Sequence, residues 1–221
     1  MQKVRLNRVV FVFAFFFLVK GGGLFAQSKF LEFKSGFVAS SPFYNPEVGK
    51  KFIDFQQGIS LSVCFGYEYP NEIIRLYAEI SYVGKGDNYP SQEFTKGKYN
   101  LIMNYFEISP QIRSYFLSGL FYFSCGFYSG YCFNSGFDGE FLSENQDVIK
   151  ITDNYKKIDF GPKASLGVEL GMQNIRGCIE VSYEYGLSNI SKLSSQKITN
   201  QALFLSLGID FKILQKNFRR F

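Results

Sequence analysis

One stretch of the chain, residues 58–69, reads GISLSVCFGYEY. Its apolar side chains fall at every second position from Ile59 to Tyr69, whereas Gly, Ser, Cys and Glu occupy the positions between them. Successive side chains of a β-strand point to opposite faces, so this alternation is typical of a strand with one apolar and one polar face. Residues 158–172 and 203–213 show the same pattern.

Five further segments alternate less regularly, which makes eight predicted strands in all. They span residues 29–38, 58–69, 73–85, 100–115, 119–132, 158–172, 176–187 and 203–213. No helical period of 3.6 residues competes with them after residue 27. The sequence therefore predicts an all-β protein.

Short and long connections alternate strictly between the predicted strands. The short ones lie at residues 70–72, 117–118 and 173–175. The long ones, rich in Gly, Ser, Asn, Asp and Lys, span 39–54, 86–99, 133–157 and 188–200. Outer-membrane barrels show this asymmetry, with short periplasmic turns and long extracellular loops. We therefore expect an eight-stranded antiparallel up-and-down transmembrane β-barrel, with both ends of the chain in the periplasm.

A soluble barrel such as a lipocalin shows the same alternation with its apolar face inside. The length of the predicted strands, about 10 residues or more, favours the membrane because tilted strands of that length span a bilayer. The Gly and Ser of the polar face suit a narrow lumen. Tyrosines near strand ends are expected to form an aromatic girdle: Tyr67, Tyr69, Tyr82, Tyr115, Tyr183 and Tyr185.

Two prolines lie inside predicted strands. Pro110 and Pro162 each remove one hydrogen-bond donor from the ladder between strands. We therefore expect a bulge or a strand end at each position.

The first 26 residues are predicted to be a signal peptide. Three basic residues precede an apolar run at residues 9–19, which is too short to span a bilayer as a helix. We expect cleavage after Ala26, a barrel domain at residues 27–213 and a short basic C-terminal tail at residues 214–221.

The composition excludes several kinds of mechanism. The chain has no His, so it lacks an imidazole base, a Ser-His pair and any His metal ligand. Its formal charge is +5, but the signal-like segment holds four of the 24 basic residues and none of the 19 acidic ones. The remainder is nearly neutral, which gives no electrostatic case for binding nucleic acid.

The charged residues of the strands share the polar face and are expected in the lumen. They are Glu32, Lys34, Glu68, Arg75, Glu79, Lys85, Glu107, Arg113, Asp159, Lys163, Glu169, Glu180, Glu184, Asp210 and Lys212. The lumen of an eight-stranded barrel is just wide enough to be filled by side chains, so we expect these acids and bases to pair as a plug. The alternative is acid–base chemistry by two carboxylates such as Glu180 and Glu184. We expect no catalytic residue, no cofactor and no metal site.

Acidic loop residues and cysteines are the remaining candidates for metal or redox chemistry. The acids of the longest predicted loop fit no EF-hand pattern and indicate a solvated loop: Asp138, Glu140, Glu144, Asp147 and Asp153. The four cysteines have no C-x-x-C spacing, and the sequence leaves their disulfide status open: Cys64, Cys125, Cys132 and Cys178.

From residue 58 onward the sequence resembles the PorT-like outer-membrane β-barrel proteins. The matching stretches are LYAEISYVGKG at 76–86, NYFEISP at 104–110, DFG at 159–161 with GVE at 167–169, YEYGLSNI at 183–190 and LSLGIDF at 205–211. The resemblance implies an eight-stranded outer-membrane barrel. The founding member of that family assists secretion of other proteins to the cell surface, but the matching motifs belong to the scaffold and include no known active site.

These observations predict a non-enzymatic integral protein of the cell outer membrane, in contact with outer-membrane lipid. We expect a scaffold with a surface-binding or secretion-accessory role, whose partners are envelope or secretion-system proteins that bind mainly at residues 133–157. The alternatives are a lipid-modifying outer-membrane enzyme, a narrow passive channel and a soluble lipocalin-like periplasmic binding barrel. The sequence identifies no specific ligand and no oligomeric state.

Overall fold

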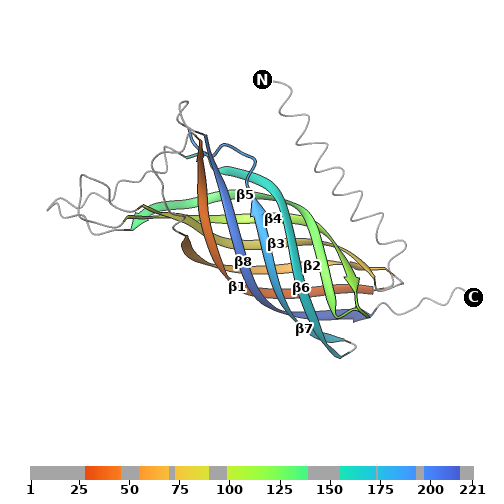
Figure 1. Ribbon diagram of the computed structural model, residues 1–221. Helices are drawn as coiled ribbons and strands as arrows, with labels where there is room; N and C mark the ends of the chain where they lie inside the picture. Colours follow the sequence, from red (N-terminus) through yellow and green to blue (C-terminus); the bar gives the residue numbers. More distant parts are fainter. Residues whose placement is uncertain are drawn as a thin grey trace, which may run out of the picture.

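In the computed structural model of the protein, eight antiparallel strands close into one barrel (Figure 1). The structure describes residues 28–45, 55–69, 73–89, 99–138, 155–172, 174–192 and 197–214. The strands are β1 (Ser28–Asn45), β2 (Gln56–Glu68), β3 (Ile74–Tyr89), β4 (Tyr99–Phe116), β5 (Phe121–Asp138), β6 (Ile158–Met172), β7 (Ile175–Tyr185) and β8 (Lys197–Leu214). Each strand pairs with its neighbour in sequence, and β1 pairs with β8. The predicted eight-stranded up-and-down barrel is confirmed.

All eight predicted strands are present, but several extend further toward the long loops. β1 continues to Asn45, β3 to Tyr89 and β5 to Asp138. These extensions contain Ser, Asn, Gly and Pro, which resemble loop sequence, yet their backbones pair with neighbouring strands. The barrel is therefore longer at its extracellular end than the sequence predicted. Nothing in the described part of the chain forms a helix long and apolar enough to cross a membrane.

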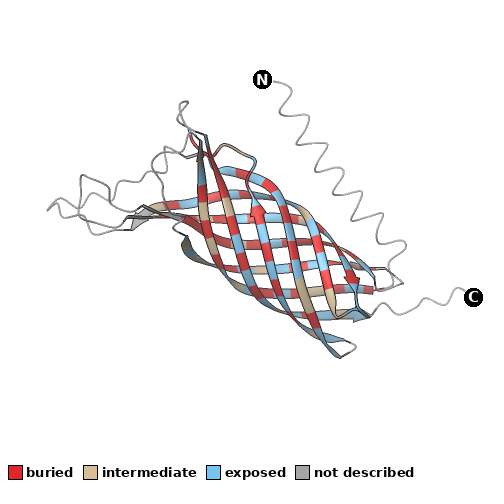
Figure 2. Ribbon diagram, viewed as in Figure 1, coloured by how far each residue is buried: buried red, intermediate tan, exposed pale blue. Residues whose placement is uncertain are grey.

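The alternation of side chains has the polarity of a membrane barrel. Figure 2 shows buried and exposed residues alternating along the strands. Large apolar residues such as Ile59, Leu166 and Leu207 point outward and are 54%, 59% and 61% exposed, whereas Ser165 and Ser206 of the same strands are buried. A soluble lipocalin-like barrel needs the opposite arrangement, so this alternative is wrong.

Pro110 lies in the middle of β4 without the expected bulge or strand end. It pairs with Ala78 of β3, and the pairing of β4 with β5 keeps the same register on both sides of it. The Ser109 hydroxyl donates a hydrogen bond of 2.9 Å to the carbonyl of Phe127, and this compensates for the N–H that proline lacks. The register shift between β4 and β5 lies instead at residues 104–105.

Pro162 lies at the end of a strand pairing, as expected, on one side of β6 only. The β6–β7 pairing ends at Lys163 and Glu184, so Pro162 lies just beyond the end of that ladder. On its other side, Pro162 pairs with Phe127 within the continuous β5–β6 ladder.

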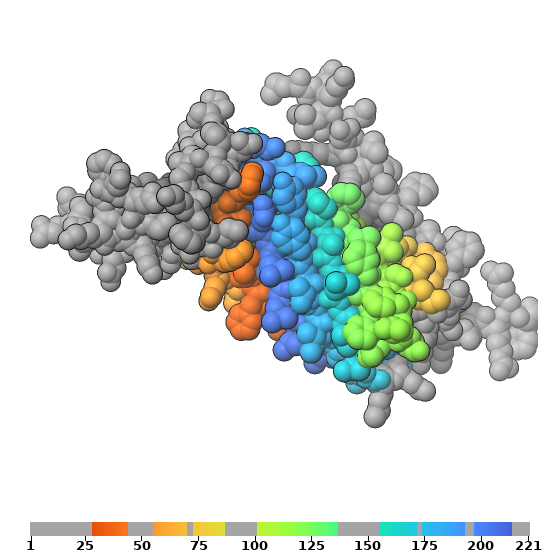
Figure 3. Space-filling model, in the orientation of Figure 1, coloured from red at the N-terminus to blue at the C-terminus, as the bar shows by residue number. Residues whose placement is uncertain are grey.

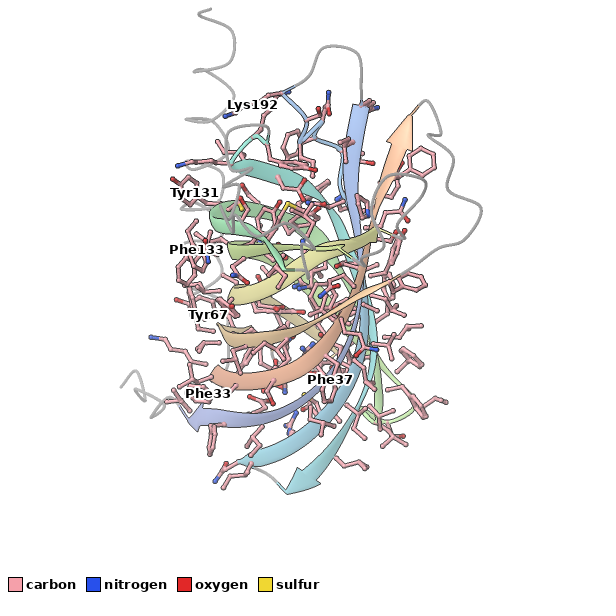
Figure 4. All side chains as sticks on the ribbon, turned by 90° about the vertical axis from the view of Figure 1, so that its left-hand side faces the viewer. Phe33, Phe37, Tyr67, Tyr131, Phe133 and Lys192 are labelled. Atoms are coloured by element: carbon pink, nitrogen blue, oxygen red, sulfur yellow. The ribbon has the colours of Figure 1, made fainter. Side chains whose placement is uncertain are left out.

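One of the tyrosines predicted for the aromatic girdle faces the lumen instead of the outer wall. Tyr115 is buried and points into the lumen, because it lies two residues from the inward-facing Arg113. On the outer wall, Tyr82, Phe106 and Phe133 contact one another, with 4.6 Å between the centroids of the two phenylalanine rings. Figure 4 labels Phe133 of this cluster. The outer wall therefore carries an aromatic cluster, and the aromatic girdle at the bilayer surface stays a prediction.

The two predicted segments outside the barrel are not part of the described structure. The predicted signal peptide at residues 1–26 lies outside the described residues, as do residues 215–221 of the predicted tail. Leu214, which the sequence assigned to the tail, is the last residue of β8.

Candidate functional site

Every strand charge predicted to face the lumen does so. All of them are buried except Lys212, whose side chain is 11% exposed. Their side chains form ion pairs that follow the barrel axis in three layers, described below from the periplasmic end upward.

The periplasmic layer is centred on Arg75. Its guanidinium lies 3.1 Å from Glu68, 3.2 Å from Glu169 and 2.8 Å from Asp210. Lys212 lies 2.9 Å from Glu68 and closes the layer at the barrel end. One arginine thus holds three carboxylates that come from three different strands.

The middle layer is a chain of alternating charges. Arg113 lies 3.1 Å from Glu32 and 3.3 Å from Glu180. Lys34 continues the chain, 2.8 Å from Glu180 and 3.1 Å from Glu79. Because these buried charges have partners on several sides, each desolvation cost is offset by more than one attraction.

The extracellular layer is built on two lysines. Lys163 lies 3.2 Å from Glu79 and 3.1 Å from Glu184. Lys85 lies 2.7 Å from Glu184 and 2.6 Å from Glu107. Since Glu79 also pairs with the middle layer, the ion pairs continue without a break through the barrel.

Asp159 lies beyond these lysines and is held by neutral donors. Tyr128 donates a hydrogen bond of 3.1 Å and Asn200 one of 2.9 Å to the same carboxylate oxygen, and Ser188 donates to the other oxygen. Ser188 belongs to the segment after β7, so this carboxylate anchors that segment to the barrel.

An apolar cluster lies above the ion pairs at the extracellular end. Its buried members are Leu101, Met103, Tyr105, Cys132, Ile190 and Ile198, and Tyr155 packs against them. Ile190 is fully buried although it lies in the predicted loop at 188–200. Residues 155–156 and 190–191 pair with each other across an isolated bridge, which fixes this segment. The filled lumen is therefore capped by apolar side chains.

Tyrosines line the lumen beside the charges, and the sequence did not identify them as lumen residues. The Arg113 guanidinium lies 4.1 Å from the ring centroid of Tyr122 and 4.9 Å from that of Tyr77. The Lys85 ammonium lies 4.4 Å from the ring centroid of Tyr128. Strand alternation could have identified these residues, because each tyrosine shares the inward face with a buried charge of its own strand or of a paired strand.

The two carboxylates considered for acid–base chemistry pair with different cations. Glu180 pairs with Lys34 and Arg113, whereas Glu184 pairs with Lys85 and Lys163. Both are buried, so the arrangement is that of an ion-pair plug. Among the described residues, no group of three or more Cys, Asp or Glu could hold a metal ion.

The remaining sequence candidates do not form a site in the described structure. Asp138 ends β5, and the other acids of the predicted solvated loop lie outside the described residues. The four cysteines are free, with Cys64, Cys132 and Cys178 buried and Cys125 exposed on the outer face. Arg176, which the sequence analysis missed, lies 2.8 Å from Glu169 at the periplasmic rim.

Three solved structures are similar to this chain at low identity. Neisserial surface protein A is 13% identical, with a TM-score of 0.46, and the match covers 84% of this chain and 97% of that one. Ail of Yersinia pestis, in complex with the heparin analogue sucrose octasulfate, is 15% identical with a TM-score of 0.41 and coverages of 84% and 99%. Outer membrane protein AlkL in lipid bilayers is 12% identical with a TM-score of 0.44 and coverages of 86% and 92%.

No curated protein sequence matches this chain. A family model described as the outer membrane protein beta-barrel domain matches residues 25–192, which is well over half of the chain. The closed barrel, its apolar outer wall and its charged lumen agree with that match. The protein therefore belongs to the family of the outer membrane protein beta-barrel domain and is a protein of the Gram-negative outer membrane.

Proposed function

We propose that the protein is a non-conducting, non-enzymatic scaffold of the outer membrane that binds its specific partner through its extracellular loops. The observation that carries this proposal is the filled lumen: ion pairs continue from Glu68 to Glu107, and an apolar cluster around Ile190 covers them. A lumen occupied in this way leaves the loops as the part of the protein that can vary in function.

The partners that we propose are proteins of the envelope or of a secretion system. This part of the proposal is supported by the resemblance to the PorT-like proteins, whose founding member assists secretion. The longest connection joins β5 to β6 across residues 139–157. We propose that it contributes most of the contact.

Conductance measurements test whether the lumen is closed. Purified protein inserted in a planar lipid bilayer should give no discrete current steps, because the ion pairs and the apolar cluster of the described residues occupy the lumen. A general porin in the same bilayer serves as the positive control. Regular steps from the wild-type protein would favour the alternative of a narrow passive channel.

Loop shortening tests where the partner binds. Replacing residues 139–154 by a tight turn should leave the barrel folded, because a change in loop length alters the closure entropy only slightly. Capture of the partner by crosslinking on intact cells should be lost. An equivalent shortening of residues 46–54 is the matched control and should reduce capture less.

A lumen function would give the opposite result. If the protein with the shortened 139–154 loop still captures its partner fully, while Glu107→Gln or Arg113→Gln abolishes capture in a folded barrel, the proposal is wrong.

A further inference from the structure

The outer wall has a groove of about 740 Å³ across β8, β1, β2 and β3. Figure 3 shows β1 and β8 side by side on the visible face. The walls of the groove include Phe33, Leu61, Ile80, Leu207 and Phe211, which all point away from the lumen. The groove therefore opens toward the bilayer.

Ser35 is the reason for the hollow. Its neighbours across the strands are Leu61 of β2 and Leu207 of β8, and along β1 it lies between Phe33 and Phe37. One small side chain among four large ones leaves a depression that is surrounded by apolar groups. In a hydrocarbon environment, a groove with such walls is complementary to an acyl chain.

A basic side chain lies on the same face of β1, toward the periplasm. Lys29 is exposed, and its ammonium lies 6.0 Å from the ring centroid of Tyr67 on β2. Within the part of the chain that the structure describes, Lys29 forms no ion pair with a carboxylate. A lysine beside a tyrosine at this level is typical of the membrane interface, where it can reach a lipid phosphate.

The difference in depth between Lys29 and Ser35 matches about one leaflet of the bilayer. Six residues of strand correspond to about 20 Å along the strand, or about 14 Å of depth at a tilt of 45°. This depth is close to half of a hydrocarbon core of about 30 Å. A lipid with its phosphate at Lys29 would therefore have its acyl chain at the level of Ser35.

We propose that Lys29 and the groove at Ser35 form a binding site for one phospholipid of the periplasmic leaflet. The Lys29 ammonium binds the phosphate, Tyr67 borders the headgroup, and one acyl chain lies in the groove between Phe33 and Leu207. The site uses the outer wall alone, so it is independent of the loops and of the partner that they bind.

Native mass spectrometry of the full protein in mild detergent, titrated with phosphatidylglycerol, tests this site. The wild-type protein should retain one lipid. Ser35→Phe fills the hollow and should raise the lipid concentration needed for half-occupancy about tenfold. Lys29→Gln should raise it about fivefold, and Lys29→Arg should restore it. A shifted gel mobility of unheated samples confirms that each variant is folded.

Two matched controls separate the groove from general lipid adhesion. Ser35→Ala keeps the hollow and should bind as the wild type does, and Val181→Phe adds the same ring on β7, outside the groove, and should also leave binding unchanged. If Ser35→Phe does not fold, Ser35→Leu fills the hollow with a smaller group. Equal binding by wild type and the filled variant, equal weakening by Val181→Phe, or a dimer that only the filled variant loses would overturn the proposal.

Discussion

At the scale of single residues, Gly167 shows how tightly the lumen is filled. A Cβ atom at this position would overlap the Tyr122 ring, which is held by a hydrogen bond of 2.9 Å to Glu180 and by the guanidinium of Arg113. Gly167→Ala should therefore destabilise the barrel by about 1–3 kcal/mol. Gly177→Ala is the control, because the atoms nearest to its new methyl group lie 3.8 Å away. Urea titration in micelles, followed by gel mobility, measures both, and equal stability of the two variants would contradict a filled lumen.

A second residue prediction concerns the buried charges. Arg113→Met removes the cation shared by Glu32 and Glu180 and should cost about 3–5 kcal/mol of unfolding free energy, because buried carboxylates lose a partner. Lys212→Met is the matched change at the barrel end, where Glu68 keeps Arg75 as a partner. The same urea titration should show a much smaller loss. A loss at Lys212 as large as that at Arg113 would mean that burial does not govern these pairs.

At the scale of strands, the outward orientation of alternate side chains can be tested by introducing a charge at two depths in the bilayer. Leu166 lies near the middle of β6, and Leu170 lies near its periplasmic end. Leu166→Arg should cost about 2–4 kcal/mol and Leu170→Arg about 0–1 kcal/mol, because the cost of a charge in lipid depends on its depth. The measurement is the unfolding free energy in lipid bilayers, where depth is defined. Equal costs at both positions would place this part of β6 outside the hydrocarbon core.

The strands and their inward charges could be predicted from the sequence because both follow from period-2 alternation. The same rule would have placed Tyr115 in the lumen, but its aromatic character favoured the girdle. The position of Ile190 could not be predicted, because its burial depends on a cluster that includes Leu101 of β4 and Cys132 of β5, which are distant in sequence. The extracellular ends of β1 and β5 were missed because their Ser, Asn and Gly resemble loop sequence while pairing satisfies their backbones.

At the scale of the whole molecule, closure predicts resistance to detergent. All strands are paired, so the backbone polar groups of the wall are satisfied without solvent. Unheated and boiled samples should therefore migrate differently on a denaturing gel. A variant that ends at residue 203 lacks most of β8 and should show a single mobility, since its barrel cannot close. A single mobility of the full chain, or its recovery among soluble periplasmic proteins, would contradict the fold.

The pairing of β1 with β8 runs along the full length of both strands, from Ser28 opposite Leu214 to Asn45 opposite Lys197. This seam joins the strand synthesised first to the strand synthesised last. During biogenesis the hydrogen-bonding groups along one edge of β1 therefore stay unpaired until the whole chain has been delivered. Contacts so distant in sequence form slowly, because the intervening chain must be ordered first. Pairing of β1 with β8 should then set the rate of insertion. A chaperone that shields the edge of β1 would prevent this edge from pairing with other chains.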